Sequence, residues 1–121
     1  MADKLSSRQQ ATLAVLDSFP PKFDQIHRLI EELGTLRADE NQARRLARML
    51  DEMKAAAAAV SEGAIADNCG TMGMLARRTG GLQTRVRGLR ETFMGLKINF
   101  EGARRRASTP EGELAPNNET Q

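Results

Sequence analysis

Tryptophan and tyrosine are absent from this chain of 121 residues, and phenylalanine occurs only four times. Aromatic and β-branched residues are enriched in strands, whereas the residues that favour helices, such as Ala, Leu, Arg, Glu, Gln and Met, are abundant here. A single cysteine, Cys69, cannot close an intrachain disulfide. That cysteine and the only histidine, His27, do not supply the ligands of a zinc site. We therefore expect an all-α protein without a disulfide framework or a metal site.

Long apolar segments are also missing. No run approaches the roughly 20 apolar residues of a transmembrane helix, and residues 1–10 are polar, unlike a signal peptide. No glycine-rich phosphate loop and no Ser–His–Asp pattern is visible, and the adjacent carboxylates diverge around their helices. We therefore expect a cytoplasmic protein that is not an enzyme, contains no cofactor and does not bind membranes.

What the chain does contain is apolar residues at helical spacing. Pro20 and Pro21 separate the first two periodic stretches, and such a pair can open the second helix. Ser7 with Gln10 resembles a capping box, Gly34 fits a helix end and Asp39 fits an N-cap. The predicted helices cover residues 7–17, 21–33, 40–61, 64–79 and 82–106. Short connections favour antiparallel neighbours, so we predict an antiparallel four-helix bundle (21–106), an extra short helix within residues 1–20 and a disordered tail (107–121).

The last predicted helix carries two patterns. Its apolar residues alternate spacings of four and three, the heptad seam of bundle packing: Leu82, Val86, Leu89, Phe93, Leu96, Phe100 and Ala103. Glycines recur every seven residues at positions 81, 88, 95 and 102. Because glycine lets another helix approach closely, we interpret this stripe as a packing groove.

The stretch 51–69, DEMKAAAAAVSEGAIADNC, contains the most specific pattern. Met53 stands two residues after Asp51 and Lys54 stands three after it; small residues follow, then Ile65–Ala66 and Cys69. This order resembles the signature of the histidine-containing phosphotransfer (HPt) family, in which a His stands where Asp51 stands here and a Gly stands where Ala55 stands. The likeness extends more loosely over residues 21–106.

The HPt family is a four-helix bundle that passes phosphoryl groups between kinases and receiver domains. With Asp51 in place of the His, the resemblance implies a degenerate member of a bacterial-type two-component pathway, which binds a receiver domain or a histidine kinase without relaying phosphate. A helical wheel turns Asp51 away from the core. The expected partner-binding residues are Arg44, Arg48, Asp51, Lys54, Ala55 and Ala58.

Other hypotheses stay open at this point. The heptad seam and the glycine stripe suit an adaptor, assembly or secretion-chaperone protein that acts through helix–helix association, including a homodimer. The basic segment 64–106, with net charge +6, suggests nucleic acid as a partner through Arg77, Arg78, Arg85, Arg87, Arg90 and Arg104–Arg106. The lack of an aromatic stacking platform argues against that partner. His27 would be the acceptor in any residual phosphotransfer.

Overall fold

The computed structural model describes residues 4–35 and 39–112, which form five α-helices and no strand. The helices are α1 (Ser7–Leu16), α2 (Pro20–Leu33), α3 (Glu40–Ala59), α4 (Gly63–Arg77) and α5 (Leu82–Ala107). Each boundary lies within two residues of the one predicted from the sequence. None of these helices is both long enough and apolar enough to cross a bilayer.

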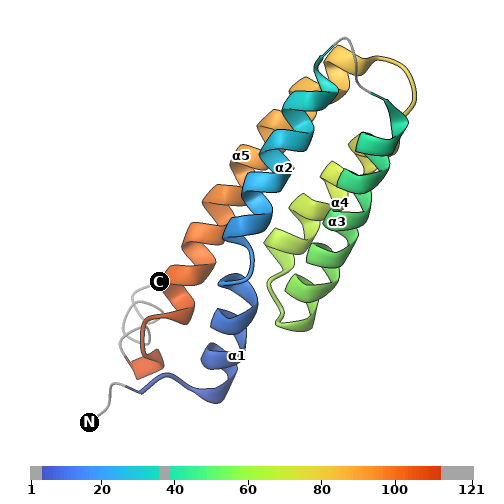
Figure 1. Cartoon of the computed structure of the whole chain (residues 1–121). Helices are drawn as coiled ribbons and strands as arrows, with labels where there is room; N and C mark the ends of the chain where they lie inside the picture. The colour runs from blue at the N-terminus through green and yellow to red at the C-terminus, as the bar shows by residue number, and fades with distance from the viewer. Residues whose placement is uncertain (1–3, 36–38, 113–121) are drawn as a thin grey trace.

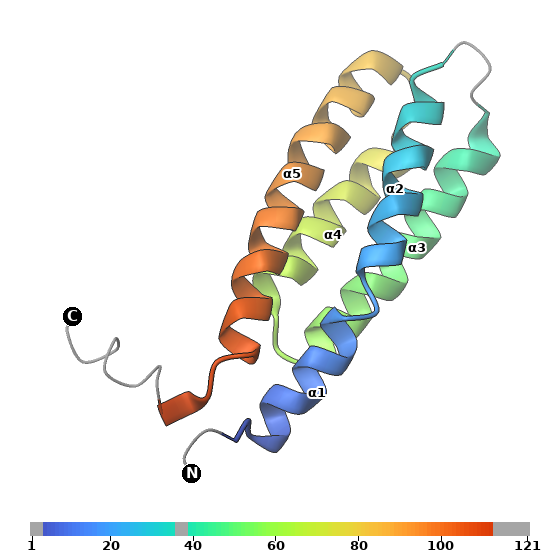
Figure 2. The same ribbon diagram turned by 60° about the vertical axis from the view of Figure 1, so that its left-hand side comes forward.

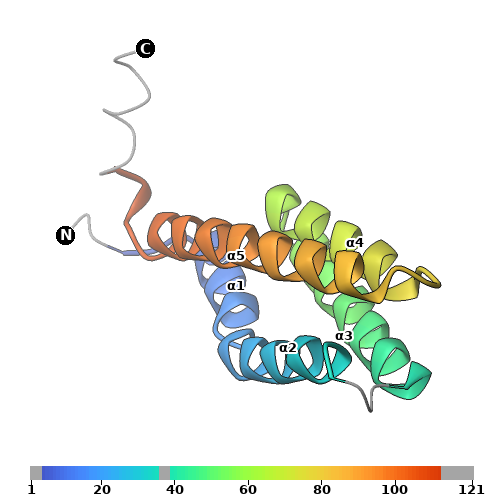
Figure 3. The same ribbon diagram turned by 90° about the horizontal axis from the view of Figure 1, so that it is seen from above.

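The four longer helices make a ring in which each contacts the next: α2 with α3, α3 with α4, α4 with α5, and α5 with α2. Consecutive helices run in opposite directions (Figures 1 and 2). α1 precedes α2 across a bend before Pro20 and Pro21 and packs beside α5. The predicted fold, an antiparallel four-helix bundle with an extra short N-terminal helix, is confirmed. In this ring α3 is diagonal to α5, as the view from above illustrates (Figure 3).

The helix starts follow ordinary capping chemistry. The Asp39 carboxylate accepts hydrogen bonds from the backbone N–H groups of Asn41 and Gln42, as predicted for the N-cap of α3. The capping box of α1, however, is made by Ser6 and Gln9, not by Ser7 and Gln10. The sequence SSRQQ contains two overlapping boxes. Packing selects the first, because it directs Gln9 inward, where that side chain is only 6% exposed.

The core joins all four helices of the ring. Residues without exposed surface include Leu16 and Phe19 before α2, Ile26 on α2, Leu46, Leu50 and Met53 on α3, Ile65 and Met72 on α4, and Leu89 and Leu96 on α5. All four phenylalanines of the chain form one cluster between α2 and α5. Within it, the rings of Phe23 and Phe100 meet edge to face with centroids 5.1 Å apart, and Phe93 lies 5.8 Å from Phe23. This cluster anchors α5 to the start of α2.

The packed part of the chain extends beyond residue 106. Gln9 donates hydrogen bonds from its side-chain amide to the carbonyl oxygens of Arg106 and Thr109. Ala107 is buried and ends α5. The expected disordered tail therefore cannot begin at residue 107, and its remainder, residues 113–121, lies outside the described residues. The shift arises because Gln9 supplies donors for one carbonyl in the last turn of α5 and for one just after it.

The four glycines of the heptad stripe have different surroundings. Gly88 lies against the Leu75 side chain of α4, and a Cβ at Gly95 would lie 3.7 Å from the Asn68 amide. These two positions form the predicted packing groove between α4 and α5. Gly81 instead precedes α5 with φ +54°, a conformation that favours glycine. Gly102 would meet only the Arg106 side chain of its own helix.

Candidate functional site

Small residues let α3 and α4 approach closely and leave room for polar side chains across their contact. Ala43, Ala47 and Ala57 of α3 and Ala66 and Ala76 of α4 are buried. Two glycines of α4 lie beneath side chains of α3: a Cβ at Gly70 would be 3.3 Å from Lys54 Nζ, and one at Gly73 would be 3.8 Å from Asp51 Oδ1. The α4 glycines therefore accommodate Lys54 and Asp51.

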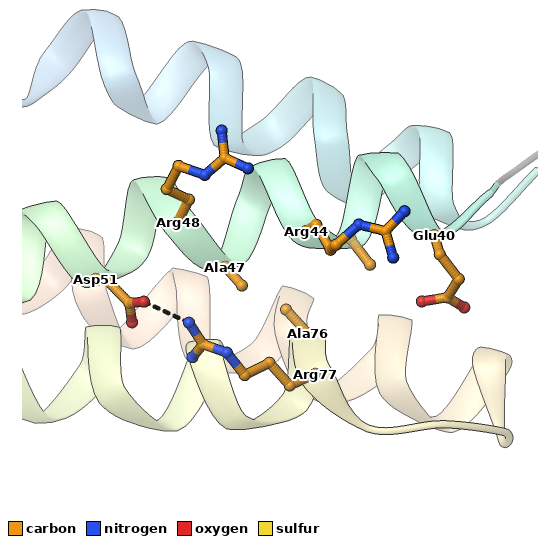
Figure 4. Close-up of a pocket in the computed structure, with 8 residues that line it drawn as sticks. Glu40, Arg44, Ala47, Arg48, Asp51, Ala76 and Arg77 are labelled. Carbon is orange, nitrogen blue, oxygen red and sulfur yellow. Dashed lines mark hydrogen bonds and ion pairs between the residues drawn. The ribbon is translucent and has the colours of Figure 1, made fainter.

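An open groove of about 400 Å³ runs between α3 and the C-terminal part of α4. Buried alanines form its floor, and charged side chains rise at its edges (Figure 4). The lining residues are Glu40, Ala43, Arg44, Ala47, Arg48, Asp51, Ala76 and Arg77. We call this feature the α3–α4 groove. Three guanidinium groups and two carboxylates surround it, so its lining carries a small positive excess.

Hydrogen bonds hold part of this charged rim in place. Arg77 Nη2 donates to Asp51 Oδ2 across the groove, and both side chains are about half exposed, 53% and 55%. Arg44 donates to the Asn41 side chain at 2.6 Å. Within the described part of the chain, no hydrogen bond or ion pair engages the side chain of Arg48 or of Lys54. Arg48 is therefore unpaired, and its guanidinium points from the edge of the groove towards α2 (Figure 4).

The structure places the expected partner-binding residues on one outer side of α3, and all six are exposed. Arg44, Arg48 and Asp51 line the α3–α4 groove. Lys54 crosses towards Gly70 one turn further on, while Ala55 and Ala58 continue the exposed surface beyond the groove. Asp51 points away from the core, as the helical wheel predicts.

Sequence reasoning missed the α4 half of the site. The sequence indicates Arg77 as a nucleic-acid contact and as part of the looser HPt likeness, not as a residue of this site, and it assigns Gly73 no role. A signal was present: folding the chain back at residues 60–62 brings α4 antiparallel to α3, with Gly73 beside Asp51 and Arg77 one turn beyond. Because Gly73 has no side chain, that arginine can reach back over it to Asp51.

The remaining candidate residues lie elsewhere. His27 is exposed on α2, one turn before Glu31, and Glu31 pairs with Arg90 of α5, so this face of α2 looks away from the α3–α4 groove. The hydrogen bonds and charge of Arg90 lower the pKa of the Glu31 carboxyl. Cys69 is buried, and desolvation raises its pKa to about 11. Across residues 4–35 and 39–112, no cluster of three or more His, Cys, Asp or Glu could hold a metal ion.

Several basic residues of segment 64–106 are engaged within the bundle. Arg85 is 5% exposed and donates to backbone carbonyls of α4. Four others pair with acidic side chains: Arg77 with Asp51, Arg90 with Glu31, Arg104 with Asp17 and Arg106 with Glu62. The positive charge is thus partly neutralised within the bundle.

Comparison with protein-family models, with curated proteins and with solved structures found no match to this chain. The groove itself therefore carries the evidence on function. Guanidinium groups on rigid helices bind carboxylates and phosphates through paired N–H donors. The shallow alanine floor permits a second protein surface to approach them. These features suit docking of an anionic protein surface.

Proposed function

We propose that this protein is a non-catalytic, HPt-like signalling module. It binds a receiver domain or a histidine kinase of a two-component-type pathway on α3 and does not relay phosphate. The observation that carries the proposal is the position of Asp51. This residue stands where the HPt signature has its phospho-accepting His. It is exposed in the middle of α3, at the edge of the α3–α4 groove.

The side chains around Asp51 support docking. The Arg48 side chain is unpaired at the edge of the groove. Ala55 and Ala58 lie one and two turns beyond Asp51 on α3, and their short side chains leave the surface there flat. A partner with acidic or phosphorylated groups would meet guanidinium groups here with little steric obstruction. Arg77 neutralises Asp51 in the unbound protein, so we assign the attraction to Arg44 and Arg48 and assign Asp51 to orienting the rim.

The binding test uses single receiver domains, each with and without beryllofluoride to imitate the phosphorylated state, titrated into ¹⁵N-labelled protein. We expect amide shifts concentrated on residues 44–58. Arg48→Glu and Ala55→Arg should each weaken the binding at least tenfold. Their matched controls on α1, Arg8→Glu and Ala14→Arg, make the same changes on exposed residues away from the groove and should leave the binding unchanged. Shifts confined to other helices, or equal losses in the controls, would exclude the α3 site.

The absence of relay is tested separately. The protein and its His27→Ala variant are each incubated with a receiver domain carrying labelled aspartyl phosphate. Because Asp51 is paired with Arg77 and His27 faces away from the groove, neither form should acquire acid-labile phosphate. Label on the unmodified protein that is lost from the His27→Ala variant would instead show that His27 is an acceptor.

A further inference from the structure

A second groove lies between α2 and α3, on the side of α3 that faces away from α4 (Figure 3). It consists of two hollows, of about 300 Å³ and about 320 Å³, which share the lining residues Gln25, Leu29 and Arg45. We call this feature the α2–α3 groove. Leu29 is buried and Met49 is half buried, so these two side chains form a small apolar floor. The floor has room for one apolar side chain of a ligand.

Unpaired cations dominate the walls of the α2–α3 groove. The guanidinium groups of Arg28 and Arg45 and the ammonium group of Lys22 line it. Arg48 turns towards it from the edge of the α3–α4 groove (Figure 4). Within residues 4–35 and 39–112, no hydrogen bond or ion pair engages any of these four side chains. Charges of one sign that gather in a groove attract a ligand of the opposite sign.

Other lining residues favour a peptide over a nucleic acid. Each hollow also has one carboxylate, Glu32 in one and Glu52 in the other, and these would repel a continuous row of phosphates. The residues that line the two hollows, all within the described part of the chain, include no aromatic side chain on which bases could stack. The exposed amide of Gln25, which lines both hollows, offers a donor and an acceptor to a peptide backbone.

We propose that the α2–α3 groove binds an acidic peptide segment of another protein, in which carboxylates stand on both sides of one apolar residue. The apolar side chain rests on Leu29 and Met49. Arg28 and Arg45, one on each wall, donate paired N–H groups to the carboxylates, which guanidinium groups bind in a fixed geometry. This site goes beyond receiver docking on α3, because Arg28 and Lys22 belong to α2 and lie outside the α3–α4 groove.

Charge reversal tests the site. The probe is a fluorescein-labelled peptide with one leucine flanked on each side by two glutamates, titrated at low ionic strength with protein up to about 1 mM and followed by fluorescence anisotropy. Arg28→Glu and Arg45→Glu should each weaken the binding at least about fivefold, because each replaces a donor with a repelling carboxylate. Arg87→Glu and Arg105→Glu are matched controls. They change the net charge equally on exposed arginines of α5 and should leave the binding unchanged. No binding of the probe, or equal losses in the controls, would overturn the proposal.

Changes in the probe test the chemistry of the ligand. Glutamine in place of the glutamates should abolish binding, and serine in place of the leucine should weaken it, because the apolar floor then has no partner. A single-stranded oligothymidine with the same number of negative charges should bind more weakly than the peptide. An oligothymidine that binds as tightly as the peptide, and is weakened equally by Arg45→Glu, would show a nucleic-acid surface and contradict the peptide site.

One further variant separates this site from receiver docking. Ala55→Arg adds bulk on the exposed surface of α3 beyond the α3–α4 groove and should leave peptide binding unchanged. Conversely, Arg28→Glu on α2 should leave receiver binding unchanged. The two proposals can therefore fail independently. If Ala55→Arg weakened the peptide as much as Arg45→Glu does, the peptide would occupy the receiver surface and the α2–α3 site would be excluded.

Discussion

The buried guanidinium of Arg85 donates from Nε to the backbone carbonyl of Leu75 at 3.1 Å and joins α5 to the C-terminal end of α4. Its Nη2 donates to the neighbouring carbonyl of Ala76 at 2.7 Å. The last carbonyls of a helix lack intrahelical partners. The chain turns away at Arg78, which is extended, so beyond the Arg78 N–H that donates to the Leu75 carbonyl the backbone supplies no further helical partners. Arg85 therefore caps α4 from a neighbouring helix.

Replacement of Arg85 by methionine tests this capping role. Arg85→Met keeps most of the aliphatic volume but removes both charge-assisted hydrogen bonds and leaves the buried Ala76 carbonyl without a donor, while the Leu75 carbonyl keeps only the Arg78 backbone N–H. We expect a loss of about 3 kcal/mol in the free energy of unfolding. Arg87→Met, at an exposed position two residues away, should change it by less than about 0.5 kcal/mol. Urea unfolding measures both, and similar losses in the two variants would contradict the capping role.

The glycine stripe of α5 gives predictions of opposite sign. Gly102→Ala should stabilise the protein by about 0.5–1 kcal/mol, because alanine favours the helix and its Cβ would meet the Arg106 side chain at an ordinary 3.5 Å. Gly81→Ala should destabilise it by about 1 kcal/mol, because φ is +54° there. Thermal unfolding of both variants provides the comparison. Equal effects at the two positions would show that local backbone geometry does not decide the outcome.

Gly88 is the packing test within the same stripe. A Cβ at this position would lie 3.1 Å from Leu75 Cδ1, which is the end of a flexible, half-buried side chain. Gly88→Ala should therefore be close to neutral, because the gain in helix propensity offsets the displacement of Leu75. Gly88→Leu should destabilise the α4–α5 contact by about 1–3 kcal/mol through overpacking. A stabilising Gly88→Leu would show that α4 and α5 are not held closely at this point.

Periodic apolar spacing was sufficient to predict the helices and the face that each turns to the core. The spacing of Leu46, Leu50 and Met53 on α3 identified its core face, and the same wheel turned Asp51 outward. The N-cap at Asp39 followed from its side-chain chemistry alone. Such features depend only on residues a few positions apart in the chain. They can therefore be predicted from the sequence alone.

Contacts between helices were harder to predict. Arg85 precedes Val86 and is not itself part of the heptad seam. No feature of the neighbouring sequence distinguishes it from the exposed Arg87. Its guanidinium is buried because it donates to two carbonyls at the end of α4. The pairing of Asp51 with Arg77 depends on the α3–α4 register and on Gly73. To predict these interactions, one must know how the helices are placed relative to one another. Apolar periodicity does not indicate that placement.

Burial of Cys69 predicts a loss of stability at alkaline pH. Desolvation raises the pKa of this thiol from 9.0 to about 11, and the charge of Lys54 lowers it by a smaller amount. The thiol deprotonates more easily in the unfolded chain. Its contribution to stability is therefore fully present below about pH 9 and is lost as the pH rises towards 11, on the order of 2–3 kcal/mol in total.

Urea unfolding of the protein and of Cys69→Ala between pH 8 and pH 11 isolates this effect from other titrations. The stability difference between the two proteins should shrink steadily above pH 9, because only one of them carries the thiol. Rapid modification of Cys69 by a thiol reagent at pH 8 without denaturant would contradict its burial. A stability difference that stays constant to pH 11 would contradict the raised pKa.

The Asp51–Arg77 pair should contribute little to stability despite its central place in the candidate site. Both side chains are more than half exposed, so water and salt screen their attraction. A double-mutant cycle with Asp51→Asn and Arg77→Met should give a coupling energy of at most about 1 kcal/mol, smaller in 0.5 M NaCl than in 0.05 M NaCl. A coupling well above this range, or one insensitive to salt, would mean that the pair is a structural clamp. If the coupling is small, any loss of receiver binding by these variants reflects the surface of the groove, because the fold beneath it is unchanged.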